Sequence, residues 1–222
     1  MPAPDPMLVY LTLRERFGHL DWWPGDSPFE ILVGALLTQQ TTWKNVEKAI
    51  ANLKHADALS LESIADMPLG RLEKLIMPSG YYRQKARRLK ELCTAIRKDH
   101  GSLGNLFRMR KEKLREVLLS YNGIGKETAD SIILYAANKP IFVIDAYTKR
   151  IMNRVDPRIS REATYDQLQD HFESKIERSA ALYNDFHAQF VELGKNYCRA
   201  KPLCRECPLN SFCDFGRSQE RR

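Results

Sequence analysis

Two short helices joined by a turn with two glycines constrain this chain more than any other stretch of its sequence. Apolar residues recur at helical spacing before the turn, over Leu114–Tyr121, and again after it, over Ala129–Ala137. Between them stand Gly123 and Gly125, and glycine tolerates positive φ and close approach of a partner. The second helix would begin at a tight turn whose unpaired N–H groups suit a phosphate. Such turns also join helices that bind nothing, so the pattern alone leaves both interpretations open.

An acidic residue follows the second helix at the end of an apolar run. The run Pro140–Ile144 stops abruptly at Asp145, and a new helical pattern starts with Tyr147, Ile151 and Met152. Asp fills the N-cap position of a helix well, which is one interpretation of Asp145. The other is a carboxylate held ionised for catalysis. The two are compatible, because a capping Asp has a fixed rotamer and keeps its charge.

The chain resembles the helix-hairpin-helix DNA glycosylase superfamily that includes endonuclease III, and within it the bacterial 3-methyladenine glycosylase III branch. The resemblance rests on GIGKETAD followed by VIDAY, and extends over about Asp21 to Cys213. Further matching motifs are a WWP near the start, an LLTQ-type helix end, and a PSG-aromatic-Tyr loop followed by QKA. Each motif is weak alone, and their combination is specific.

The resemblance implies an all-α protein with two domains. Residues 28–138 would form a six-helix barrel ending in the helix-hairpin-helix. Residues 1–27 would join residues 139–222 in a second helical domain that carries a cysteine loop at 198–213. The helical patterns along the chain agree with an all-α fold. One predicted helix, Arg83–Asp99, is rich in lysine and arginine, including Lys85, Arg87 and Arg88.

Charge and composition favour a polyanion as partner. Lys and Arg number 35 against 28 Asp and Glu, giving a net charge of +7 and a pI near 9.2. The chain has no run of 18 apolar residues, and its first residues, MPAPDPMLVY, lack the pattern of a signal peptide. We therefore expect no membrane insertion and a cytoplasmic location, associated with a bacterial or archaeal nucleoid. The expected partner is double-stranded DNA with a damaged base, bound by a monomer.

Four of the five cysteines form a cluster near the end of the chain. Cys198, Cys204, Cys207 and Cys213 lie within sixteen residues, with five, two and five residues between them. Such density in a cytoplasmic protein favours metal binding over a disulfide framework. Structural zinc sites have two close cysteine pairs, and here only one pair is close, so a [4Fe–4S] cluster suits the spacing better than zinc. The endonuclease III group has six residues in the first gap, one more than here.

The resemblance also implies which residues meet DNA. A glycosylase must first flip the target base out of the duplex, which costs a few kcal/mol. Gln40 and Tyr81 match positions that fill or wedge the gap, and Gly123, Gly125 and Lys126 form the phosphate-binding hairpin. The pocket for an alkylated purine would be built from Trp22, Trp23, Pro24 and Trp43, with Glu127 at its edge. A cationic base over an indole face gains roughly 0.5–2 kcal/mol.

Asp145 would then carry the chemistry. A carboxylate near C1′ stabilises an oxocarbenium-like transition state and can orient or deprotonate water. In bifunctional relatives a lysine replaces Glu127 and forms the Schiff base that leads to strand cleavage. Lys126 lies one residue earlier, about 100° around the helix. We therefore predict a monofunctional enzyme that releases the base and leaves an abasic site.

Three alternatives remain open from sequence. The chain could be a mismatch or uracil/thymine glycosylase, which would need hydrogen-bonding groups for a neutral pyrimidine. It could be a bifunctional, endonuclease III-like enzyme. It could also be a non-catalytic DNA-binding module, since helix-hairpin-helix units serve that purpose in many proteins; an aromatic pocket together with Asp145 argues against this last interpretation.

Overall fold

The computed structural model describes residues 4–20, 22–23, 25–156 and 163–220. Within these ranges the protein is all-α, with extended loops and turns but no strand, as the sequence predicts. None of the helices in this described part is long and apolar enough to cross a membrane.

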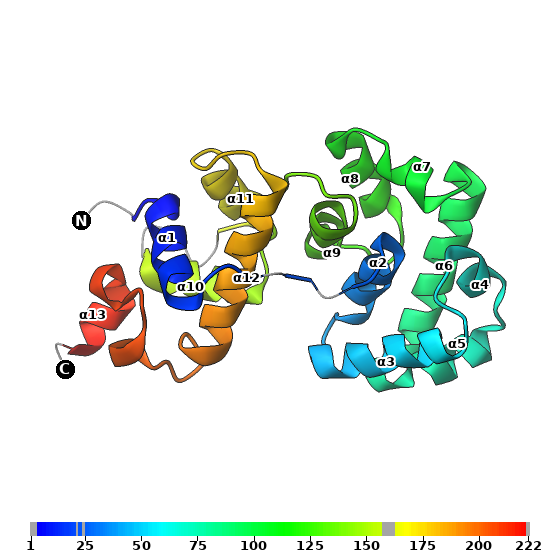
Figure 1. Cartoon of the computed structure of the whole chain (residues 1–222), viewed down its shortest axis with the longest axis horizontal. Helices are drawn as coiled ribbons and strands as arrows, with labels where there is room; N and C mark the ends of the chain where they lie inside the picture. Colours follow the sequence, from blue (N-terminus) through cyan, green and yellow to red (C-terminus); the bar gives the residue numbers. More distant parts are fainter. Residues whose placement is uncertain (1–3, 21, 24, 157–162, 221–222) are drawn as a thin grey trace. The chain divides into compact units, whose positions relative to one another are not determined.

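The chain divides into two compact units (Figure 1). One unit is continuous and comprises Trp23–Lys139. The other joins Met1–Trp22 to Pro140–Arg222 and is therefore discontinuous in sequence. We call them the continuous unit and the discontinuous unit.

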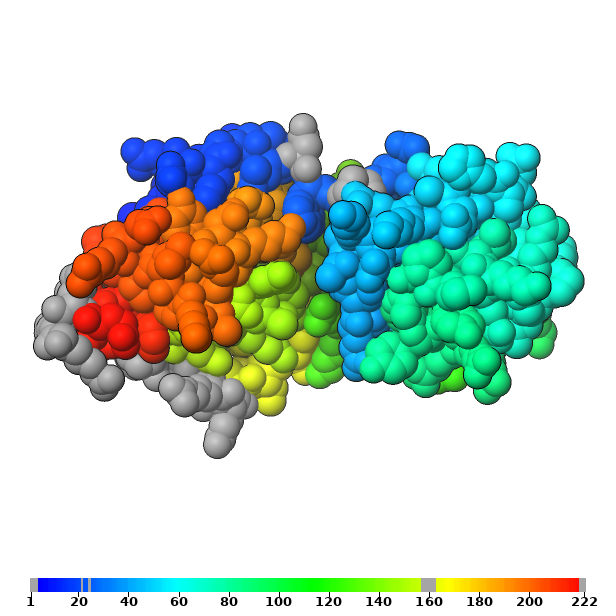
Figure 2. All heavy atoms as spheres, turned by 90° about the horizontal axis from the view of Figure 1, so that it is seen from below, coloured from blue at the N-terminus to red at the C-terminus, as the bar shows by residue number. Residues whose placement is uncertain are grey.

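The continuous unit is built around α6, a long amphipathic helix (Tyr82–His100). Helices α2, α4, α5 and α7 pack on it, with Ala86, Leu89, Cys93 and Ile96 fully buried along its inner face. In Figure 2 the residues of α3 to α6, coloured light blue to green, cover most of the visible face of this unit. Its other helices are α2 (Pro28–Leu37), α3 (Trp43–His55), α4 (Leu61–Asp66), α5 (Leu69–Ile76), α7 (Leu103–Phe107), α8 (Lys111–Ser120) and α9 (Lys126–Ser131).

Helix starts in this unit follow local sequence rules. The Ser27 hydroxyl accepts a hydrogen bond from the N–H of Glu30, and Pro28 occupies the first turn of α2. Ser60 and Ser102 cap α4 and α7 in the same way. Helix α2 is apolar on nearly every side, and Leu32, Val33, Leu36 and Leu37 have no exposed surface.

Helix α9 does not continue as the single α-helix that the spacing of Ala129–Ala137 predicts. After Ser131 the chain widens into a π-helical turn, Ile132–Ala136, and this turn packs on α2. π-helical turns are rare and commonly lie at functional sites. The apolar run after it is extended and buried over Ile141–Ile144.

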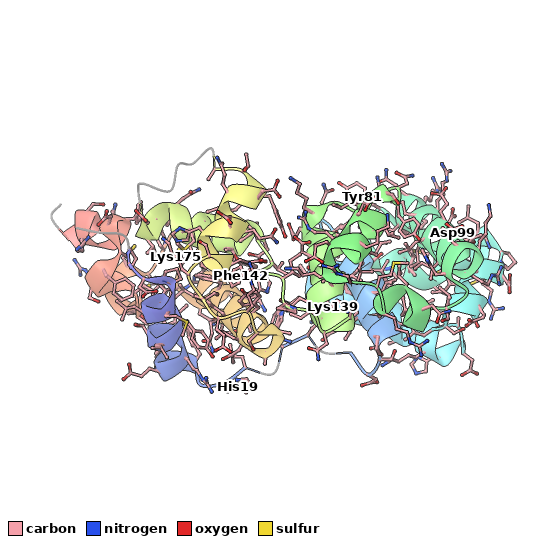
Figure 3. The ribbon with its side chains drawn as sticks, turned by 90° about the horizontal axis from the view of Figure 1, so that it is seen from above. His19, Tyr81, Asp99, Lys139, Phe142 and Lys175 are labelled. Atoms are coloured by element: carbon pink, nitrogen blue, oxygen red, sulfur yellow. The ribbon has the colours of Figure 1, made fainter. Side chains whose placement is uncertain are left out.

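The discontinuous unit has an aromatic core. Phe142 stacks on Phe172 with ring centroids 4.2 Å apart, and Phe186 stacks on Phe190 at 4.8 Å; Figure 3 labels Phe142 among the side chains of this unit. Its helices are α1 (Pro6–Phe17), α10 (Ala146–Val155), α11 (Tyr165–Glu173), α12 (Ala180–Asn196) and α13 (Asp214–Glu220). Helix α13 was not predicted from sequence, because seven residues after the last cysteine show too little periodicity.

Candidate functional site

The helix-hairpin-helix is formed by α8, a turn over Tyr121–Gly125, and α9. Gly123 has a φ of +82°, which a residue with a side chain adopts only with strain. Gly125 is extended, at φ −90° and ψ 177°, and a Cβ built on it would meet no other atom within 4 Å. Among the described residues no backbone or side-chain acceptor binds the N–H groups of these two glycines. They are donors that an anion could satisfy.

The first turn of α9 carries the two residues that separate the monofunctional and bifunctional interpretations. Lys126 and Glu127 are both exposed. As neighbours in one helix they point about 100° apart. The next turn of α9 is held on α8, because Arg115 of α8 donates two hydrogen bonds to the buried Asp130 carboxylate, at 2.7 and 3.1 Å.

Three predicted site residues share an unusual backbone conformation. Trp23, Gln40 and Tyr81 have φ values of +73°, +53° and +45°. A left-handed backbone conformation is uncommon for residues other than glycine, and its energetic cost is highest for bulky residues. Tyr81, which Figure 3 labels, is also 66% exposed. An exposed aromatic ring on a strained backbone suits a residue that inserts into a partner better than one that supports the core.

A buried lysine connects the loops that carry Gln40 and Tyr81. Lys85 is only 3% exposed, and its Nζ donates to the Leu37 carbonyl at 2.9 Å and the Ser79 carbonyl at 2.6 Å. Burial lowers the pKa of Lys85 to about 8. The sequence predicted only a helix rich in lysine and arginine here, and the structure buries the Lys85 side chain of that helix.

Gln39 ties the same loop to the hairpin. Its Nε2 donates to the Gly123 carbonyl and to the Thr128 hydroxyl, both at 3.0 Å. Gln40 therefore directly follows Gln39, which is bonded to the hairpin, and lies three residues after Leu37, whose carbonyl accepts from Lys85. The hairpin, Gln40 and the turn before Tyr81 are held in one arrangement.

Trp23 and Trp43 form an aromatic cluster with a residue that the sequence did not single out. Trp23 stacks on Tyr135 with centroids 4.9 Å apart and meets Trp43 edge-on at 5.4 Å. Tyr135 comes from the π-helical turn. Gly34 of α2 lies against the cluster, since a Cβ there would be 3.4 Å from each of the two indoles. The buried Nε1 atoms of Trp23 and Trp43 have no hydrogen-bond acceptor in the described part of the chain.

The other two predicted pocket residues differ. Trp22 already has a cation on its ring, with the Lys195 Nζ 5.0 Å from the centroid. A cationic base would have to displace Lys195 to use that face. Pro24 lies outside the described residues.

Asp145 caps α10 and has a histidine beside it. Its Oδ1 accepts hydrogen bonds from the Thr148 N–H at 2.7 Å and the Thr148 hydroxyl at 2.9 Å. Its Oδ2 lies 3.6 Å from Nε2 of His187, which is ion-pair range and too long for a hydrogen bond. Burial alone would raise the pKa of Asp145, but His187 and Thr148 outweigh it and lower that pKa. The carboxylate is therefore ionised at neutral pH.

A second buried carboxylate holds the loop that precedes the tryptophans. Asp185 accepts hydrogen bonds from the Tyr10 hydroxyl at 2.7 Å and the Leu20 N–H at 3.0 Å. Gln189 donates to the Gly18 carbonyl at 2.7 Å and to Asp185 at 3.1 Å. Gln189 thus has a structural role here.

The four clustered cysteines lie around one small cavity, which Arg154, Tyr197 and Phe215 also line. Burial and the nearness of the other three thiols raise the pKa of Cys207 to about 11. Arg154 Nη1 donates to Cys198 Sγ at 3.2 Å, and the Gly216 N–H donates to Cys213 Sγ at 3.5 Å. Within the described ranges no three His, Cys, Asp or Glu side chains are already arranged as a metal site.

Residues 33–178 match the family model of HhH-GPD superfamily base excision DNA repair proteins. The chain belongs to this superfamily. A protein of Methanocaldococcus jannaschii, named provisionally as a DNA repair glycosylase, is 44% identical over 92% of this chain and 94% of its own. The chain is therefore a member of a DNA glycosylase family.

Two solved structures are similar in fold. The crystal structure of H. pylori 3-methyladenine DNA glycosylase bound to 1,N6-ethenoadenine has a TM-score of 0.76 and 33% identity, covering 86% of this chain and 98% of that one. A non-covalent endonuclease III–DNA complex has a TM-score of 0.83 and covers 97% of both chains. Its 22% identity supports the fold alone.

Sequence reasoning missed three residues of the candidate site: Lys85, Tyr135 and His187. Tyr135 lies on an apolar helix stretch and resembles a core residue. His187 lies 42 positions after Asp145 in a helix full of aromatic residues, and nothing in the sequence pairs the two. Only the i, i+3 contact between Asp145 and Thr148 carried a local signal, that of an N-cap.

Proposed function

We propose that this protein is a monofunctional DNA glycosylase that removes alkylated, positively charged purines of the 3-methyladenine type from double-stranded DNA. It would act as a monomer, hydrolysing the N-glycosidic bond and leaving an abasic site. The observation that carries the proposal is the aromatic cluster of Trp23, Trp43 and Tyr135, which packs closely over Gly34 of α2.

The cluster suits a cationic purine for two physical reasons. Indole and phenol faces attract cations through their ring quadrupoles, by roughly 0.5–2 kcal/mol per contact. The unpaired Nε1 donors of Trp23 and Trp43 are buried groups that an acceptor nitrogen of a purine could satisfy. The 3-methyladenine glycosylase with 33% identity supports the same substrate class.

Asp145 would act on the sugar. As the glycosidic bond breaks, its electron pair leaves with the base, which becomes neutral, while positive charge develops at C1′ and O4′. An ionised carboxylate stabilises that charge, and water then bonds to C1′ and gives its proton to the carboxylate. The hydrogen bonds from Thr148 hold Asp145 Oδ1, which leaves Oδ2, beside His187, for this work.

Strand cleavage is not part of the proposed reaction. It would require an amine to attack C1′ and form an imine, and Glu127 cannot do so. Lys126 is exposed at the start of α9 and points about 100° away from Glu127.

We further propose that the four cysteines hold a [4Fe–4S] cluster, with zinc as the alternative. Burial, and after it the nearness of the other three thiols, raises the pKa of Cys207, so four thiolates here would not stay ionised together without a cation. Cys198 Sγ accepts a hydrogen bond from Arg154 and Cys213 Sγ accepts one from the Gly216 N–H, as suits thiolate sulfur bound to metal. When bound, the cluster would stabilise the loop rather than take part in base removal.

The test is the release of bases from methylated genomic DNA, identified by mass spectrometry. The native protein is expected to release 3-methyladenine, and Asp145→Asn to release none. Release of thymine from G·T mismatches or of uracil, in preference to alkylated purines, would transfer the assignment to the mismatch class. Binding without any base release would support the DNA-binding module instead.

A further inference from the structure

Arg88 of α6 lies directly against the hairpin turn. A Cβ built on Gly123 would overlap Cδ and Nε of Arg88 and would lie 3.0 Å from its Cζ. The glycine therefore has two roles: it permits the positive φ of the turn and it leaves the space through which the arginine passes. The side chain is half-buried in this position.

The guanidinium of Arg88 has no hydrogen bond or ion pair within the described part of the chain. Two other arginines of the continuous unit are paired: Arg115 with Asp130 at 2.7 Å, and Arg97 with Asp66 at 2.8 Å. Glu91, one turn further along α6, makes its polar contact with Asn122 of the hairpin at 3.5 Å. A half-buried guanidinium with five donors and no acceptor is suited to an anion from outside the chain.

The hairpin supplies more donors at the same place. The N–H groups of Gly123 and Gly125 also have no acceptor among the described residues. Arg88 thus adds a fixed positive charge beside backbone donors that come from a different part of the sequence. Guanidinium and amide donors together form strong, directional contacts with phosphate oxygens.

We propose that Arg88 is a DNA-binding residue that holds a backbone phosphodiester together with the hairpin turn at Gly123. This inference rests on the proposed function, because it requires duplex DNA as the partner. The contact positions the duplex and reads no base, so it applies equally to damaged and undamaged DNA. It gives α6, which carries Lys85 as well, a direct part in DNA binding.

The experiment measures fluorescence anisotropy of a labelled, lesion-free duplex at several salt concentrations. Arg88→Gln removes the charge and keeps most of the side-chain length. The matched control is Arg87→Gln: Arg87 is the exposed neighbour on α6 and lines a groove with Leu69, Lys90 and Lys98. Each phosphate contact contributes about 0.9 to the slope of log K against log salt concentration.

Arg88→Gln is expected to make that slope shallower by about 0.9, which corresponds to about eightfold weaker binding at 0.1 M salt. Arg87→Gln is expected to change affinity less than about twofold, since it loses charge without a contact. Arg88→Lys keeps the charge and is expected to keep the slope, provided that its melting temperature is native.

Equal slopes for Arg88→Gln and Arg87→Gln, with native DNA binding intact, would overturn this inference and leave the proposed function standing. An Arg88→Lys variant as weak as Arg88→Gln would also overturn it, because charge would then not be the cause. Should the native protein fail to bind duplex DNA at all, the proposed function and the inference would fail together.

Discussion

Replacing Lys85 by methionine tests whether a buried ammonium joins the two loops that carry Gln40 and Tyr81. The substitution keeps most of the side-chain volume and removes the donors to the Leu37 and Ser79 carbonyls. Each buried carbonyl left without a donor costs about 1–3 kcal/mol. Methionine has no charge to desolvate, which offsets part of that cost, so we expect a net loss of about 2 kcal/mol at pH 7.

The pH dependence is more specific. The pKa of Lys85 falls from its ordinary 10.5 to about 8 on folding. Between these values the unfolded chain binds more protons than the folded one, so native stability rises with pH, by up to about 1.4 kcal/mol per pH unit. Methionine has no such term. The difference in unfolding free energy between the native protein and Lys85→Met should therefore grow by about 2 kcal/mol between pH 7 and pH 9.5.

Tryptophan fluorescence during urea unfolding can measure this difference in the continuous unit alone. The chain has three tryptophans, and Trp22→Phe leaves only Trp23 and Trp43, which both belong to that unit. Lys90→Met is the matched control, because Lys90 donates to the Ala65 and Met67 carbonyls at 2.6 and 2.7 Å but is half exposed. Water can replace its hydrogen bonds, so the expected loss is about 1 kcal/mol or less.

Two results would refute the reasoning. A difference between native protein and Lys85→Met that stays constant from pH 7 to 9.5 would mean that the ammonium is not desolvated in the fold. A Lys85→Met variant no less stable than Lys90→Met at pH 7 would mean that the two carbonyls do not depend on it.

Four further predictions concern the candidate site and the cysteine loop. Asp145→Asn should abolish base release and leave duplex affinity unchanged. The lowered pKa of Asp145 stabilises the fold above about pH 4, and this stabilisation is lost as pH falls through that pKa. The free energy of unfolding of the variant should therefore fall less steeply in acid than that of the native protein. Trp43→Ala should reduce excision of alkylated adenine at least tenfold, about 1.4 kcal/mol, in single-turnover assays while duplex binding changes little. Metal analysis should find about four irons per chain, and Cys204→Ser should lower both the iron content and the melting temperature, whereas one zinc and no iron would contradict the cluster. Borohydride should trap no covalent adduct on lesion-containing duplex with native protein or Lys126→Ala, and an adduct lost only in Lys126→Ala would identify a bifunctional enzyme.

Features encoded within a few neighbouring residues were predictable from the sequence. The hairpin follows from two glycines between helical patterns, the cap on α10 from an Asp after an apolar run, and the cysteine loop from its spacing. Each depends on contacts between residues that are close in sequence, which local patterns describe well. The all-α fold follows from the same patterns.

Features that depend on contacts between distant segments could not be predicted in this way. Lys85 looks like any other lysine on a basic helix until the carbonyls of Leu37 and Ser79 are placed beside it. His187 can be recognised as a site residue only from its contact with Asp145, and Arg88 only from its contact with Gly123. The π-helical turn has no sequence signature of its own, so the orientation of Tyr135 could not be anticipated either.

The discontinuity of one unit has a consequence for synthesis on the ribosome. Helix α1 emerges first, yet its buried residues Val9, Tyr10 and Leu13 pack in the unit that includes α12, and Tyr10 bonds Asp185, 175 positions later. At about 5–20 residues per second, α1 waits roughly ten to thirty-five seconds for its partner. During that time the whole of Trp23–Lys139, which forms a compact unit without α1 or α12, is translated. In nascent chains the hairpin should therefore form before Asp145 can contact His187, and the cysteine loop should form last.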